Sequence, residues 1–142
     1  MKKPTKEDAR IMLQLEELLL MEPNQIAMHW FWRMFNPQKL ASREEIRKAY
    51  PANSEGQRYF DRISAFWESA GTLVKNDLLN ERLFFDRFLV KPYWDALKQV
   101  IFSDREETNE PRVGENFEWL AMREETWRNA GLRRSKTKTT GK

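Results

Sequence analysis

The strongest constraint on the fold is an apolar stripe between residues 59 and 74. Its members recur every three or four residues, which is the spacing along one face of an α-helix. They are Tyr59, Phe60, Ile63, Phe66, Trp67, Ala70 and Val74. Ser54 and Gln57 stand ahead of the stripe in the spacing of a capping box, so we expect the helix to begin there. No segment alternates with a period of two for the length of a strand, and the sequence therefore predicts an all-α fold.

Capping-box spacings at Thr5 and Asp8 and at Ser42 and Glu45, together with other start and stop signals, predict further helices. We expect them over about residues 5–21, 24–35, 42–50, 78–89, 91–107 and 114–129. Asn24 is the expected cap of the second helix, and Gly131 is the expected stop of the last. Whether the chain breaks or only kinks at Pro92 is left open. The prediction is a compact single-domain bundle of six or seven helices.

The excess of basic residues lies entirely at the C-terminal end of the chain. Residues 1–131 contain 20 Lys and Arg against 22 Asp and Glu, a net charge of −2, while residues 132–142 contain five basic residues and no acid. We predict a helical domain over residues 1–131 and a basic, disordered tail over residues 132–142. The tail is either a solubilising terminus or a nucleic-acid-binding segment that acts by counterion release. Its candidate residues are Arg133, Arg134, Lys136 and Lys138.

Several classes of chemistry lack the residues that they need. The chain has no cysteine, which excludes disulfides, thiolate metal sites and cysteine nucleophiles. His29 is the single histidine, and Trp32 and Arg33 occupy the helical positions where a second metal ligand would stand. Adjacent acids such as Glu16 and Glu17 point in different directions from a helix. We therefore expect no metal, no cofactor and, as the preferred interpretation, no catalytic activity.

The sequence shows no export or membrane signal. It contains no run of about 18 apolar residues, the length that would span a bilayer as a helix. Met1 is followed by charged residues rather than by the apolar core of a signal peptide. We expect a cytoplasmic protein that does not enter the membrane.

The densest apolar segment is residues 26–35. At about 100° per residue, its apolar side chains cover roughly 240° of the helix and leave His29 and Arg33 as a narrow polar strip. One interpretation is a central helix that its neighbours surround. The other is a helix with one side docked against a second copy or another protein, because aromatic residues dominate interface hot spots. The candidate interface residues are Trp30, Phe31, Trp32 and Phe35.

Glu68 and Arg105 are candidate partners on two different helices. Glu68 borders the apolar stripe of its helix, and Arg105 closes the helix that carries Trp94. An ion pair between them would fix how the two helices cross, at a modest net gain because desolvation offsets the attraction. The alternative is a ligand-binding role for Glu68 and Arg105, with Trp94 beside them.

A family resemblance rests on short motifs in the second half of the chain. The motifs are Phe66 to Val74, Asn76 to Leu79, Tyr93-Trp94, Ile101, Arg105 and Phe117 to Ala121. In order and spacing, about residues 58–128 resemble the bacterial and phage helical proteins grouped as domain of unknown function 4760. Many members carry an N-terminal membrane helix, whereas we expect no membrane helix in this sequence. The resemblance implies an all-α fold and singles out Glu68, Gly71, Trp94 and Arg105, but it implies no activity because the family is uncharacterised.

The function that we expect is a helical protein-interaction or regulatory module, with a homodimer as one form of that interaction. Two alternatives belong to other classes. The first is nucleic-acid association through the basic tail. The second is an enzyme or small-ligand binder with a pocket between helices near Glu68, Trp94 and Arg105.

Overall fold

The computed structural model describes the backbone of residues 2–140 and the side chains of residues 2–131. Within that part, the chain contains seven α-helices and no strand, which confirms the predicted all-α bundle. The helices are α1 (Lys6–Leu20), α2 (Glu22–Trp30), α3 (Arg43–Ala49), α4 (Glu55–Lys75), α5 (Glu81–Arg87), α6 (Lys91–Thr108) and α7 (Glu115–Thr140). A π-helix, η1 (Phe31–Phe35), and a 3-10 helix, η2 (Asn36–Gln38), continue α2.

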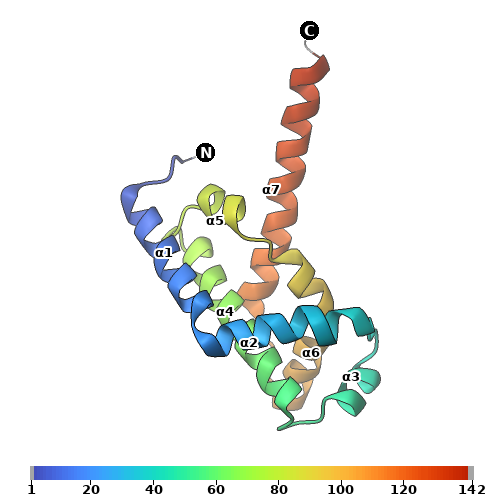
Figure 1. Ribbon diagram of the computed structural model, residues 1–142. Coiled ribbons are helices and arrows are strands. Elements are labelled where there is room, and N and C mark those ends of the chain that lie inside the picture. Colours follow the sequence, from blue (N-terminus) through green and yellow to red (C-terminus); the bar gives the residue numbers. More distant parts are fainter. Residues whose placement is uncertain (1, 141–142) are drawn as a thin grey trace.

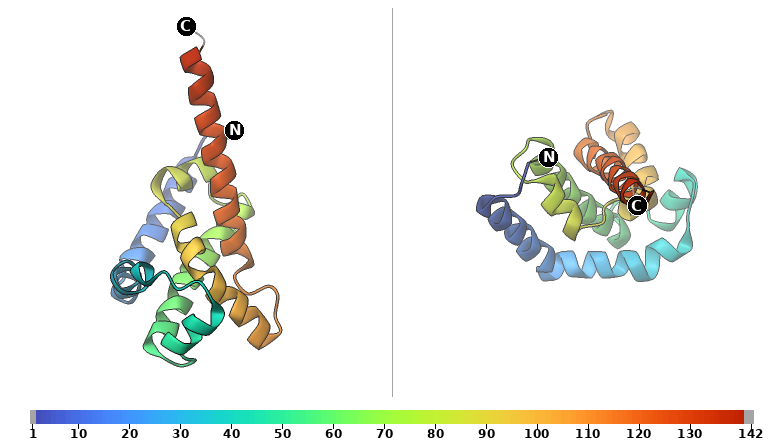
Figure 2. Two further views of the ribbon diagram at one scale, coloured as in Figure 1. Left: turned by 90° about the vertical axis from the view of Figure 1, so that its right-hand side faces the viewer. Right: turned by 90° about the horizontal axis from the view of Figure 1, so that it is seen from above.

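Helix α4 lies at the centre of the bundle (Figure 1). The contact between α4 and α7 is the most extensive one between two helices in the described part of the chain. Helix α2 also packs against α4. Helix α6 packs against α7, and α3 packs against α6. Seen from above, α1, α2 and η1 form an arc along one side of the molecule (Figure 2). We call these residues, 6–35, the N-terminal arc.

The apolar stripe predicted on residues 59–74 is the core face of α4. All of its members are buried except Tyr59, which is half-buried and packs against the core. Gly71 lies on the same face, and a Cβ atom added there would collide with the main-chain carbonyl of Asn116 on α7. The absence of a side chain at Gly71 therefore allows the close approach of α4 to α7.

The three predicted N-terminal caps are confirmed. The hydroxyl oxygens of Thr5, Ser42 and Ser54 each accept a hydrogen bond from the backbone N–H three residues later, at 3.1, 3.1 and 3.2 Å. At Thr5 the bond is reciprocal, because the Asp8 carboxylate accepts from the Thr5 backbone N–H at 2.7 Å. These bonds satisfy amides that would otherwise lack a helical partner, and they fix where α1, α3 and α4 begin.

The predicted cap at Asn24 is wrong. Helix α2 begins at Glu22, with Met21 as its N-cap and Pro23 in its first turn, where a proline is tolerated. Asn24 instead donates a hydrogen bond from Nδ2 to the carbonyl oxygen of Leu18 at 2.7 Å. Its side chain therefore binds the last turn of α1, because that turn has carbonyl groups without helical partners.

Two other helix boundaries are decided by the structure. The chain breaks before Pro92, because Phe88 has extended backbone angles and ends α5 before α6 begins. Helix α7 does not stop at Gly131 but continues to Thr140. Gly131 is not among the residues with positive φ, and a glycine inside a helix costs only about 1 kcal/mol relative to alanine.

The C-terminal part of α7 extends beyond the other helices (Figure 1). The side chains of the predicted nucleic-acid residues, Arg133, Arg134, Lys136 and Lys138, lie outside the described part of the chain. The division into a domain of residues 1–131 and a disordered tail of residues 132–142 therefore stays a prediction. Among the described residues, no helix has both the length and the apolar character needed to cross a bilayer.

Candidate interaction site

The four predicted interface residues occupy different environments. Phe31 and Phe35 are buried in the core, with exposed fractions of 0% and 3%. Trp30 is half-buried in an aromatic cluster and stacks on Phe35, with 5.8 Å between ring centroids. Only Trp32 has a large exposed area, 46% of its surface. The N-terminal arc is thus neither fully enclosed nor a flat aromatic face, and Trp32 is its outward-facing aromatic residue.

Trp32 is held in its exposed position by Tyr93 on α6. Its indole Nε1–H donates a hydrogen bond to the Tyr93 hydroxyl oxygen at 2.8 Å, and the two rings meet edge to face with centroids 5.2 Å apart. The Tyr93 ring also stacks on Phe31 at 4.7 Å. Burial raises the pKa of the Tyr93 hydroxyl, and the hydrogen bond from Trp32 opposes that rise. The position of the indole is therefore fixed by contacts within the chain.

The backbone beneath Trp32 is a π-helix. The N–H of Asn36 donates to the carbonyl oxygen of Phe31, five residues earlier, so this turn contains one residue more than an α-helical turn. In this turn Phe31 and Phe35 are buried, whereas Trp32 and Met34 are exposed. Single π-helical turns occur frequently at functional sites.

A groove lies next to the π-helix, between residues 35–41 and α6. Its volume is about 480 Å³, which is within the range of ligand-binding clefts. The lining residues come from both walls: Phe35, Asn36, Lys39, Leu40, Ala41, Pro92, Asp95, Ala96, Lys98 and Gln99. Pro92 is adjacent in sequence to Tyr93, and Asn36 is one helical turn after Trp32. We call this groove together with Trp32 and Tyr93 the Trp32 groove.

The Trp32 groove has an excess of positive charge. Asp95 forms an ion pair with Lys91 Nζ at 2.8 Å. Lys39 and Lys98 lie on opposite walls, and neither has a carboxylate within 4.0 Å in the described part of the chain. The amides at the start of α6 are not available to an anion, because Glu124 already accepts from the N–H groups of Val90 and Lys91 at 2.8 and 3.2 Å.

The predicted pair of Glu68 and Arg105 does not form. The Glu68 carboxylate accepts hydrogen bonds from the backbone N–H groups of Asn116 and Phe117, at 3.0 and 2.8 Å for its Oε2 atom. Arg105 donates from Nε to the carbonyl oxygen of Val113 at 2.7 Å. The two side chains instead hold the start of α7 and the turn before it, because unpaired amides and carbonyls stand there.

Trp94, the third member of that predicted group, is a core residue. It is 3% exposed and packs edge to face against Phe117, with 5.3 Å between ring centroids. A shallow groove between α6 and α7 reaches it, but the carboxylate of Glu68 and the guanidinium of Arg105 do not line that groove. The predicted ligand-binding group is therefore not brought together around a cavity.

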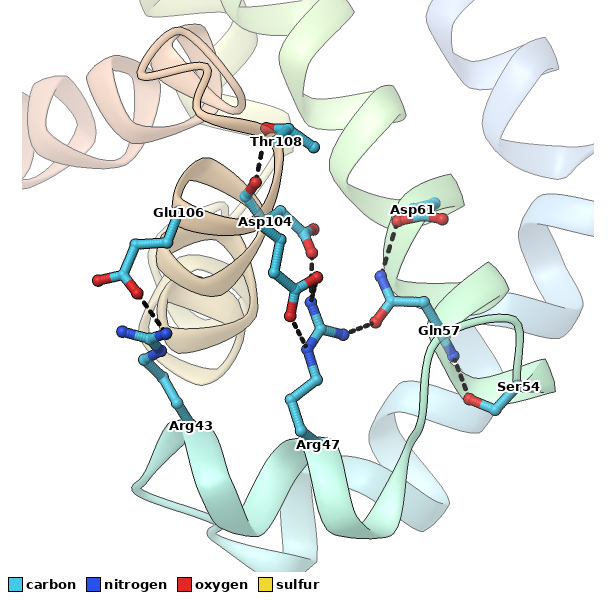
Figure 3. A network of polar contacts seen from close by, with 9 residues as sticks. Arg43, Arg47, Ser54, Gln57, Asp61, Asp104, Glu106 and Thr108 are labelled. Carbon is cyan, nitrogen blue, oxygen red and sulfur yellow. Dashed lines mark hydrogen bonds and ion pairs between the residues drawn. The ribbon is translucent and has the colours of Figure 1, made fainter.

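An arginine-centred polar network was not foreseen from the sequence. Arg47 on α3 forms ion pairs with Asp104 at 2.6 Å and with Glu107 at 2.9 Å, both on α6 (Figure 3). Arg47 also donates to the side-chain carbonyl of Gln57 on α4. The side-chain Nε2 atom of Gln57 in turn donates to the carboxylate of Asp61 at 3.0 Å. The network joins α3, α4 and α6.

The network has the character of a structural contact. Burial raises the pKa of the Asp104 carboxyl, and the hydrogen bond and charge of Arg47 oppose that rise. The two carboxylates and the Gln57 amide all have partners within the network. Its signal in the sequence is a pair of complementary spacings: Arg43 and Arg47 one turn apart, and Asp104 and Glu107 one turn apart. Neither spacing indicates that the two basic residues contact the two acidic ones.

The described residues hold no group of three or more His, Cys, Asp and Glu side chains that could bind a metal ion. His29 is exposed on the outer side of α2, in the polar strip that it was expected to share with Arg33.

Comparisons with known proteins identify a family. The family model described as domain of unknown function (DUF4760) matches residues 7–124. No curated protein and no solved structure matches the chain. The family match reaches further toward the N-terminus than the resemblance over about residues 58–128, and it includes the N-terminal arc from residue 7 onward and the whole Trp32 groove. Because the match covers most of its length, the chain belongs to the DUF4760 family.

Proposed function

We propose that this chain is a protein-interaction module, without catalytic activity, that docks a protein partner at the Trp32 groove. The observation that carries the proposal is Trp32 itself. Its indole ring is 46% exposed, yet a hydrogen bond to Tyr93 and an edge-to-face contact fix its position. A pre-positioned tryptophan loses little conformational entropy on binding and is among the most frequent hot-spot residues.

The distribution of exposed apolar side chains also points to the N-terminal arc, which contains Trp32, as the interaction surface. Ten large hydrophobic residues are exposed in the described part of the chain, and seven of them lie between residues 13 and 34. The seven are Leu13, Leu18, Leu20, Met21, Ile26, Trp32 and Met34. Exposed apolar residues that gather on one element often mark an interaction surface. The N-terminal arc is therefore the side that we expect a partner to cover.

A purely structural role for Trp32 is the competing explanation. In that case its ring serves only to cover Phe31 and Tyr93, and its exposed edge has no partner. A structural role predicts lower stability on removal of the indole but no change in binding. The two explanations therefore differ in what a substitution at Trp32 does to a complex.

Photocrosslinking at position 32 tests the proposal. We expect benzoylphenylalanine at position 32 to crosslink a discrete protein species in the cell, and the same group at Leu78 to give none. Leu78 is a suitable control because it is 57% exposed and lies outside both the N-terminal arc and the groove. The crosslinked protein, once purified, should bind Trp32→Ala about tenfold or more weakly than the unmodified chain.

The outcomes separate cleanly. Equal crosslinking at positions 32 and 78, or a purified partner that binds Trp32→Ala as tightly as the parent, would contradict the proposal. Leu78→Ala should leave the affinity unchanged. The predicted cytoplasmic location belongs to the same proposal, and fractionation of cells that produce the chain tests it.

Nucleic-acid association through the end of α7 is a second candidate. The observation that favours it is that α7 extends beyond the other helices, toward the part of the sequence with five basic residues and no acid (Figure 1). A basic helix that stands apart from a domain can approach a phosphate backbone without hindrance from the domain. The body of the molecule, with a net charge of −2 over residues 1–131, adds nothing to that attraction.

A further inference from the structure

We infer that the partner of the Trp32 groove is a second copy of this chain, which inserts the corner between its α1 and α2. The corner is residues 17–22, where α1 ends and α2 begins. The inference rests on the proposed function and names the partner of the same site. It follows from the charge and the apolar character of the two surfaces.

The Trp32 groove combines lysines with apolar lining residues. Lys39 and Lys98 line it from opposite walls. Arg33 is exposed next to Trp32 and, like the two lysines, has no ion pair within the described residues. The apolar part of the lining consists of Phe35, Leu40, Ala41, Pro92 and Ala96. A fitting occupant carries carboxylates on either side of an aliphatic group.

The α1–α2 corner has that composition. Leu20 and Met21 are 65% and 56% exposed, more than a surface helix needs to leave uncovered. Glu17 and Glu22 stand on either side of them, are exposed, and form no ion pair within the described residues. No Lys or Arg occurs between Arg10 and Arg33, so the corner contributes only negative charge of its own.

Basic residues close to the corner in the same molecule do not pair with Glu17 or Glu22, and Arg87 on α5 pairs with Glu16 instead. Arg58 and Arg62 on α4 line a shallow hollow of about 380 Å³ together with Glu22. Arg58 donates to the carbonyl oxygen of Asn53 at 3.1 Å, and Arg62 donates to Asn24 Oδ1 at 3.4 Å. Neither lies within ion-pair distance of Glu22. The carboxylates of the corner are thus free to meet the lysines of another copy.

A charge-swap experiment on the whole chain tests the inference. Sedimentation velocity should show concentration-dependent association of the wild type that weakens at high salt, because the contact contains exposed ion pairs. The groove variant K39E/K98E and the corner variant E17K/E22K should each weaken self-association about tenfold or more. An equimolar mixture of the two variants should regain association, since each then meets a surface of opposite charge.

A matched control separates this contact from net charge. K3E/K48E makes the same change in net charge as K39E/K98E, at exposed lysines that lie outside the groove, the corner and the N-terminal arc. It should associate like the wild type. Circular dichroism of each variant confirms that the helices are retained.

The failures of the inference and of the proposed function are distinguishable. A wild type that stays monomeric at all concentrations, or an unrestored mixture of the two variants, overturns the inference. Association that falls equally in K3E/K48E also overturns it. If position 32 nevertheless crosslinks a different protein, the proposed function stands and only the identity of the partner changes.

Discussion

At the scale of single residues, three carboxylates bind the first amides of helices other than their own. Glu68 on α4 binds the start of α7, Glu124 on α7 binds the start of α6, and Asp8 on α1 accepts from the backbone N–H of Asn80 at the start of α5 at 2.9 Å. A helix N-terminus combines unpaired N–H groups with partial positive charge. These contacts therefore orient helices that are distant in sequence.

Glu124 gives the sharpest stability prediction. Its side chain is 1% exposed, so Glu124→Ala leaves the amides of Val90 and Lys91 without a buried acceptor. We expect the free energy of unfolding to fall by about 3 kcal/mol, as measured by urea denaturation. Glu125→Ala, at the exposed neighbouring position, should change it by less than about 0.5 kcal/mol. Similar losses for the two variants would contradict the capping role.

Asp8 gives a pH-dependent prediction. Hydrogen bonds, foremost from the Thr5 backbone N–H, hold the pKa of its carboxyl below the ordinary value of 3.8. A group whose pKa is lowered on folding stabilises the protein fully above its unfolded pKa, and this contribution is lost as the pH falls through the folded pKa. Urea midpoints between neutral pH and about pH 3 should therefore fall more for the wild type than for Asp8→Asn. Asp86→Asn, at an exposed position on α5, should behave like the wild type.

At the scale of elements, the packing of α4 against α7 depends on one missing side chain. Gly71 faces the main chain of Asn116 so closely that any Cβ atom would force the helices apart. The same pair of helices is joined by the Glu68 contacts one turn earlier. The close contact at Gly71 and the hydrogen bonds to Glu68 therefore both hold the N-terminal end of α7 against α4.

Two glycine substitutions test this packing. Gly71→Ala should lower the free energy of unfolding by about 1–3 kcal/mol, because a backbone atom rather than a flexible side chain blocks the added methyl group. Gly131→Ala should instead raise it by up to about 1 kcal/mol, since an added Cβ meets nothing within 4 Å and alanine favours the helix. Thermal denaturation followed by circular dichroism measures both, and a neutral Gly71→Ala would contradict the close contact.

At the scale of the whole molecule, charge and packing divide the chain differently. The packed part extends to about Trp127, whose ring lies against Phe85 with 5.6 Å between centroids. The family match ends at residue 124, close to the same point. The excess of basic residues begins only at residue 132, which is after the end of this packed part.

Removal of residues 132–142 tests what that basic segment does. The deletion changes the net charge from +3 to −2. We expect any affinity for duplex DNA at low salt to disappear, as followed by electrophoretic mobility shift, because the remaining body is slightly acidic. The free energy of unfolding should change by less than about 0.5 kcal/mol. DNA affinity that survives the deletion would move the binding surface onto the body.

Local sequence patterns account for the secondary structure of this protein over most of its length. The stripe of residues 59–74 and the caps at Thr5, Ser42 and Ser54 are local signals, since a helical face and a capping hydroxyl need only neighbours within one or two turns. The exceptions are residues with two possible local roles. Asn24 bonds back to α1 instead of capping α2, and Gly131 continues a helix that it could have ended.

Which side chains meet depends on how the helices are arranged in space. Glu68 could be matched to Arg105 by charge, but it binds amides on α7 that no side-chain pattern reveals, because every helix start offers the same backbone groups. Trp32 and Tyr93 are 61 residues apart, and neither residue indicates that the other fixes it. The groove between residues 35–41 and α6 exists because a π-helical turn and a left-handed Lys39 redirect the chain there. Periodicity predicts the faces of helices, whereas the contacts between faces depend on how the helices cross.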